Sequence, residues 1–181
     1  MDICRKVGSQ INALRKLKNI LPCKTKESLY RAFILPYFSY CSQVWYHCGR
    51  RNIEKLKRTN ARALRFVYSD KILTYEALLG RIRSTSTLEN RRTQDMLLTV
   101  NNIIQGRAPS SLKNLITEKR TAYNLRRNFN LSIPKVNTTR YGLKSWHYAA
   151  AKYWNMLPRD ICSMAGSKDF LKKIQQTDFH V

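Results

Sequence analysis

Apolar residues recur every three or four positions through most of this 181-residue chain. This spacing is the period of an α-helix with one buried face, so it predicts helices rather than strands. We expect an all-α fold, an irregular bundle of about six to eight helices with one long basic loop or short extended segment. The longer expected helices start near Ile3, Lys26, Asn52, Leu88 and Trp146.

Basic residues are threaded through these helical segments rather than collected in one tail. The chain has 34 Lys and Arg against 11 Asp and Glu, a formal net charge of +23. A compact body this basic repels itself unless a polyanion or counterions neutralise it, so a polyanionic partner is the first expectation. The alternative is a basic solvated surface with no specific partner.

Breaks in the periodicity predict where the helices end. Pro22 is expected to end the first helix, and Gly49 the second. Thr25 is expected to cap the second helix, and Pro36 to kink or split it. Thr74 and Ser167 are expected to cap two short helices, and Gly106 to form a left-handed cap after the helix that starts near Leu88. On that helix the pattern predicts a buried apolar face made of Leu29, Phe33, Tyr37, Tyr40, Cys41, Val44, Trp45 and Cys48.

The periodicity fades between residues 117 and 142, where basic and aromatic residues alternate with polar ones. Pro134 and the alternation at 131–133 predict an extended loop or a short edge strand. The sequence therefore divides into a helical region (1–116), a basic loop (117–142) and a C-terminal helical region (143–181).

The residues predict no site for catalysis, metal or cofactor. The five Cys are scattered without a CxxC pair, which is typical of a reducing compartment and not of zinc binding. The carboxylates are isolated from one another, and the six Gly form no phosphate loop. No run of about 18 uncharged apolar residues occurs, so we expect no membrane partner, and no small-molecule ligand.

Four segments, in order, resemble the region after the polymerase core in reverse transcriptases of non-LTR (LINE-like) retrotransposons, particularly the jockey-like group. They are Leu29–Trp45 (LYRAFILPYFSYCSQVW), Ile53–Val67, Val100–Pro109 (VNNIIQGRAP) and Trp154–Pro158 (WNMLP). Thr59 stands where the family pattern suggests Gln. The paired aspartates of the family's polymerase signature are absent.

The resemblance implies a piece of such a protein: the thumb-like and C-terminal helical part, without the catalytic palm. In the parent RNA-directed DNA polymerase this region is implied to grip the template–primer duplex and the element RNA. We therefore expect a non-catalytic chain that binds RNA, DNA or an RNA–DNA duplex, mainly through phosphates. The missing palm is a second expected partner, and the expected location is a nuclear or cytoplasmic ribonucleoprotein.

The candidate binding residues are the cations outside the apolar stripes, since Lys and Arg on a rigid helix suit contacts to phosphate. They are Lys55, Lys57, Arg58, Arg62 and Arg65 on one helix, Arg15, Lys16 and Lys18 near the start, and Arg126 and Arg127 in the loop. Two other functions remain open: an orphaned protein-interaction module, or an inactive pseudogene-like product with no function of its own.

Overall fold

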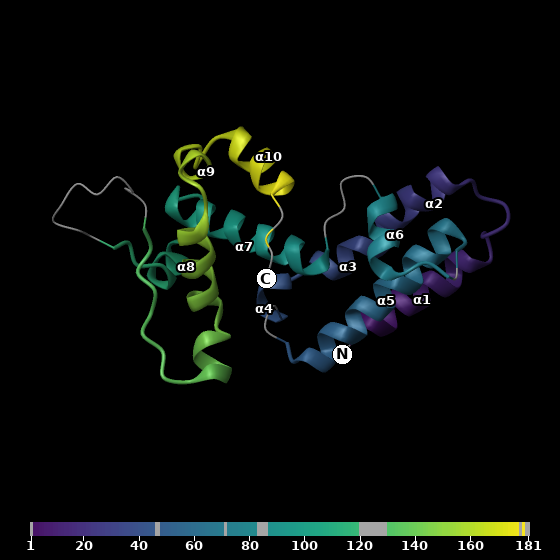
Figure 1. Cartoon of the computed structure of the whole chain (residues 1–181), viewed down its shortest axis with the longest axis horizontal. Helices are drawn as coiled ribbons and strands as arrows, with labels where there is room; N and C mark the ends of the chain where they lie inside the picture. Colours follow the sequence, from purple (N-terminus) through teal and green to yellow (C-terminus); the bar gives the residue numbers. More distant parts are fainter. Residues whose placement is uncertain are drawn as a thin grey trace. The chain divides into compact units, whose positions relative to one another are not determined.

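The computed structural model describes residues 2–45, 48–70, 72–82, 87–119, 130–177 and 179. Within these ranges the secondary structure is helical, apart from an isolated antiparallel β-bridge between Glu118 and Leu131 (Figure 1). The predicted all-α fold class is therefore confirmed. The chain forms two compact units, Met1–Leu88 and Glu89–Val181.

In the first unit the long helix α5 is central. The elements are α1 (Asp2–Arg15), α2 (Cys23–Leu29), the π-helix η1 (Tyr30–Ile34), α3 (Leu35–Ser39), α4 (Ser42–Trp45), α5 (Arg50–Tyr68) and α6 (Tyr75–Arg81). Helices α1, α2 and α6 and the π-helix all pack against α5 (Figure 1). The core formed between them includes Val7, Ile11, Tyr30, Ile34, Phe38, Leu56, Leu64, Val67 and Leu78.

A short polar chain crosses this apolar core. The hydroxyl of Tyr30 donates to Oδ1 of Asn60 (2.8 Å), and Nδ2 of Asn60 donates to the hydroxyl of Tyr75 (2.9 Å). Asn60 is buried, so its amide would cost free energy without these partners. The three side chains thereby fix η1, α5 and α6 against one another.

The second unit is built on α7, of which all residues but the first, Leu88, belong to this unit. Its elements are α7 (Leu88–Ile104), the 3₁₀ helix η2 (Ser110–Leu115), the π-helix η3 (Thr139–Leu143), α8 (Trp146–Met156), α9 (Arg159–Ser163) and α10 (Lys168–Gln176). The Trp154 and Phe170 rings meet with centroids 6.0 Å apart. Its other buried apolar residues include Met96, Leu97, Val100, Leu131, Ala150, Leu157 and Ile174.

Side-chain amides join distant parts of the second unit. The Asn155 amide pairs with the backbone of Leu131 at both ends, each bond 2.9 Å long. Oδ1 of Asn101 accepts from the Gly166 N–H (3.2 Å), and the Arg107 guanidinium donates to the Gly166 carbonyl (3.0 Å). These bonds join Leu131 to α8, and they join α7 and the residues just after it to Gly166, which precedes α10. The structure therefore groups residues 89–116 with the C-terminal region, whereas the sequence suggested seams near 117 and 142.

Several helix ends lie where the sequence predicts them. The Thr74 hydroxyl accepts from Ala77 N–H at the start of α6, and the Ser167 hydroxyl accepts from Phe170 N–H at the start of α10. Gly106 follows α7 with φ +68°, as expected for a left-handed helix cap. The predictions for Pro22 and Gly49 are wrong: α1 ends earlier, at Arg15, and Gly49 precedes α5 as its N-cap.

The predicted helix 26–47 is also wrong in two respects. The chain turns helical at Cys23 with Pro22 at the N-cap, so Thr25 lies inside α2 and does not cap it. The second difference is the π turn η1, which the sequence does not predict; it interrupts the α-helix just before Pro36, which lies in the first turn of α3, so the predicted interruption at this proline is confirmed. A π turn holds one more residue than an α-helical turn, so it rotates the following side chains around the axis.

This rotation changes which side chains are buried. Tyr30, Ile34, Leu35 and Phe38 enter the core, whereas Phe33 is 53% exposed, Tyr40 77% and Val44 87%. Half of the predicted apolar face is therefore exposed, namely Phe33, Tyr40, Cys41 and Val44. The other four residues, Leu29, Tyr37, Trp45 and Cys48, are half-buried.

Candidate nucleic-acid interface

Helix α5 carries a line of cations along one face. Arg51, Lys55, Arg58, Arg62 and Arg65 follow one another at spacings of four, three, four and three residues, which keeps them on one side of an α-helix. The first four are exposed and Arg65 is half-buried. We call these five residues the α5 stripe. The core side chains Leu56, Asn60, Ala63, Leu64 and Val67 occupy other sides of the helix.

Two of the predicted residues on α5 differ from the others. Lys57 is half-buried and lies three residues before the buried Asn60, so it is on the flank of the core and outside the stripe. Arg51 belongs to the stripe, although the sequence pattern predicts this helix only from Asn52 onward. Its four-residue spacing from Lys55 was the signal that could have identified it.

The carboxylate nearest to the stripe along α5 is engaged elsewhere. Glu54 forms an ion pair with Arg50, with 3.4 Å between Nε of Arg50 and Oε1 of Glu54. In the described parts of the chain, no stripe side chain forms an ion pair with Asp or Glu. The stripe's positive charge is therefore not neutralised within those parts.

The other predicted residues lie elsewhere. Arg15 is the last residue of α1, and Lys16 and Lys18 follow it in a turn; the first two are exposed and Lys18 is half-buried. Cations at this position also interact favourably with the carbonyl end of a helix, which gives them a structural role. Helix α1 packs on α5, but these three cations are not on the stripe.

Arg126 and Arg127 lie outside the described residues, as do Tyr123 and Phe129 of the same loop. On either side of them the backbone is paired: Lys119 N–H donates to Asn130 O (2.9 Å), and Ser132 N–H donates to Thr117 O (2.8 Å). Residues 131–133 form no strand, only the isolated bridge between Glu118 and Leu131, so the extended loop is the alternative that agrees with the described chain.

Two titratable groups near the C-terminal end of α5 have shifted pKa values. Burial, with a smaller contribution from Glu27, raises the pKa of Tyr68 to about 12. Hydrogen bonds from the backbone N–H groups of Ile72 and Leu73 lower the pKa of Asp70. The Arg81 guanidinium lies 5.8 Å from the Tyr68 ring centroid and 3.5 Å from Asp70. The raised pKa of Tyr68 and the lowered pKa of Asp70 both lie farther from 7 than the ordinary values of these groups, so neither group is suited to proton transfer near pH 7.

In the part of the chain that the structure describes, no three His, Cys, Asp or Glu side chains gather in a way that could hold a metal ion. The five cysteines are free thiols. Among the described helices, none combines the length and the apolar character needed to cross a membrane.

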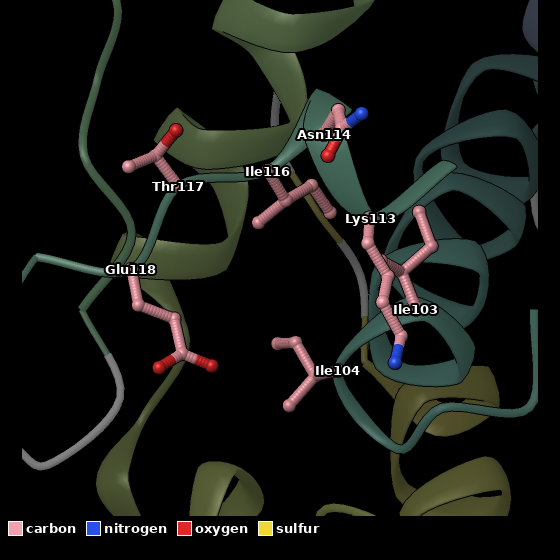
Figure 2. Close-up of a pocket in the computed structure, with 7 residues that line it drawn as sticks. All are labelled: Ile103, Ile104, Lys113, Asn114, Ile116, Thr117 and Glu118. Atoms are coloured by element: carbon pink, nitrogen blue, oxygen red, sulfur yellow. The ribbon is translucent and has the colours of Figure 1, made fainter. Parts of the chain in front are cut away.

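A hollow of about 750 Å³ lies beside η2 in the second unit. Figure 2 shows Ile104 and Ile116 in it, with the Lys113 and Glu118 side chains on opposite sides of its opening. The one cation is therefore matched by one carboxylate, and the lining gives no preference for a charged ligand. The α5 stripe remains the strongest cationic feature of the described chain.

No family model, no curated protein and no solved structure matches the chain.

Proposed function

We propose that this chain is a non-catalytic nucleic-acid-binding module that holds a duplex through its phosphates. The observation that supports this most strongly is the α5 stripe: five cations in register on one face of a nineteen-residue helix. The first unit as a whole has eighteen Lys and Arg against five Asp and Glu, so its field attracts polyanions.

The dimensions of the stripe suit a nucleic-acid backbone. From Arg51 to Arg65 the helix rises about 21 Å, at about 1.5 Å per residue. Duplex DNA carries one negative charge per about 1.7 Å of axis, so a parallel stretch presents about twelve charges. Cations fixed on a rigid, packed helix can meet such a surface without reading its bases, and contacts of this kind position a protein rather than select a sequence.

The resemblance to the region after the palm of LINE-like reverse transcriptases suggests which duplex this chain binds. Under this proposal the duplex is the RNA–DNA template–primer hybrid. The polymerase reaction takes place in a palm on another part of the parent protein, and this chain binds the hybrid. The segment Ile53–Val67, which carries part of the resemblance, contains four of the five stripe residues.

The test is the salt dependence of binding, measured by fluorescence anisotropy with RNA, DNA and RNA–DNA duplexes. Each phosphate contact contributes about −0.9 to the slope of log K against log salt. The triple variant Lys55→Gln, Arg58→Gln, Arg62→Gln should therefore make the slope about 2.7 units less negative. A wild-type slope near zero would refute the proposal.

The matched control removes three exposed cations from the second unit: Lys135→Gln, Lys152→Gln, Lys173→Gln. It lowers net charge by the same amount but leaves the stripe intact, so its slope should stay close to that of the wild type. If both triple variants changed the slope equally, binding would follow total charge and the stripe would not be the site.

A further inference from the structure

An aromatic groove lies on the first unit, between α1, η1, α3 and α4. Its volume is about 770 Å³, within the range of sites that hold small organic ligands. Four of its lining residues are aromatic: Phe33, Tyr37, Tyr40 and Trp45. Among the lining residues that the structure describes, Lys6 is the one charged residue and none is a carboxylate.

Two irregularities of the backbone form this groove. The π turn η1 brings Phe33 to the surface while its neighbours Tyr30 and Ile34 are fully buried. After α3, Cys41 has φ +50°, a left-handed conformation that is uncommon for any residue other than glycine. Both the π turn and strained backbone of this kind are found preferentially at functional sites.

Two of the four rings in the groove are open to solvent, whereas Tyr37 and Trp45 are half-buried against the core. Phe33 is 53% and Tyr40 77% exposed, although both could contribute to a core in a regular helix. The indole N–H of Trp45 donates to the carbonyl of Tyr40 (3.0 Å), which fixes the position of that ring. The groove therefore offers a prearranged set of aromatic faces.

We propose that this groove binds unpaired bases of a single-stranded nucleic acid by stacking. The inference rests on the proposed function and extends it from phosphate contacts to a second site of different chemistry. Every base has an aromatic face, so aromatic side chains in a basic surrounding suit single strands of many sequences. The positive charge of the unit, and a described lining whose one charged residue is Lys6, favour this polyanionic occupant over a basic peptide.

The test compares two single-stranded probes of equal length at one salt concentration: a DNA oligonucleotide and the same sugar–phosphate chain without bases. The full chain should bind the base-containing probe about five- to a hundredfold more tightly, because stacking on an aromatic ring contributes at this level per base. Phe33→Ala and Tyr40→Ala should each remove most of this preference and leave binding of the abasic probe unchanged. Ile72→Ala, at an exposed apolar residue outside the groove, is the control and should change neither.

Tryptophan fluorescence gives an independent readout. Adding the base-containing probe should quench the emission of the full chain, and Trp45→Phe should abolish most of this quenching, whereas the abasic probe should cause little. Circular dichroism confirms that each variant keeps its helical content.

The outcomes separate the two proposals. Equal affinity for both probes would overturn the stacking site while leaving the duplex-binding proposal intact. Groove variants that weakened both probes equally would also overturn it, because the residues would then act through the fold. A chain that bound neither probe nor any duplex would refute both proposals.

Discussion

The pairing of Asn155 with Leu131 gives the sharpest prediction about stability. In the bridge to Glu118, the backbone bonds are made by the residues on either side of Leu131, so its own N–H and C=O point away from that strand. The Asn155 amide accepts from the N–H and donates to the C=O, both at 2.9 Å. The Asn155 side chain thus makes the two hydrogen bonds that a neighbouring strand would otherwise make to Leu131.

The replacement Asn155→Ala removes both bonds. A hydrogen bond contributes about 0.5–1.5 kcal/mol net, and each partner left unsatisfied in the interior adds a further cost. Leu131 is 2% exposed, so we expect a loss of about 2–3 kcal/mol. For a cooperative unit of about 90 residues, that loss lowers Tm by roughly 10–20 °C.

The replacement Asn155→Asp tests the direction of the bonds. A carboxylate accepts from the N–H but faces the carbonyl with a second acceptor, so at pH 7 it should destabilise at least as much as alanine. Protonation restores a donor, so the variant should recover part of its stability, relative to Asn155→Ala, as pH falls below about 5.

Urea unfolding followed by tryptophan fluorescence measures these changes, and hydrogen exchange at the Leu131 amide reports the bond directly. Asn102→Ala, at an exposed position of α7, is the control and should stay within about 0.5 kcal/mol of the wild type. A loss below about 0.5 kcal/mol in Asn155→Ala would show that solvent replaces the amide without cost and would refute the reasoning.

Two further predictions concern backbone and pH. Gly166 has φ +91°, so Gly166→Ala should lower the free energy of unfolding in urea by about 1–3 kcal/mol. Gly8 lies in the middle of α1 with no atom within 4 Å of an added Cβ, so Gly8→Ala should raise it by about 0.5–1 kcal/mol. An unchanged stability of Gly166→Ala would show that the backbone at this position is not strained. The Asp70 pKa is lowered from 3.8 in the folded chain, so its contribution is present above that value and lost as pH falls below it. Asp70→Asn keeps an acceptor for the two N–H groups and should weaken the acid dependence of the urea midpoint below pH 4; an unchanged acid dependence would contradict the assignment.

Local signals predicted much of this fold because their physics is local. Thr74 and Ser167 cap helices through bonds to N–H groups three residues away, and Gly106 takes a conformation that other residues avoid. Helix α5 was predicted within two residues at its start, since its apolar and basic faces are separated along its whole length.

The segment from Cys23 to Trp45 could not be predicted in the same way. Its apolar residues are numerous enough to suit more than one helical register, and the extra residue in η1 decides between them. The hydrogen bond from Tyr30 to Asn60, whose amide in turn bonds Tyr75, favours the observed register, and these partners are distant in sequence. The Asn155–Leu131 pairing could not be predicted for the same reason, because its partners are distant in sequence. The place of Arg51 on the stripe could not be predicted because it depends on where α5 begins.

The π turn also bears on how such a chain can change by mutation. A π turn is the trace of one extra residue in a helix whose two ends keep their packing. Loss of a single codon within 30–34 would convert it to an ordinary α-helical turn, and the core residue Phe38 on the following helix α3 could keep its place. The exposed ring of Phe33, which lies inside the π turn, could thus be gained or lost among related genes in one step of insertion or deletion, independently of the cations on α5.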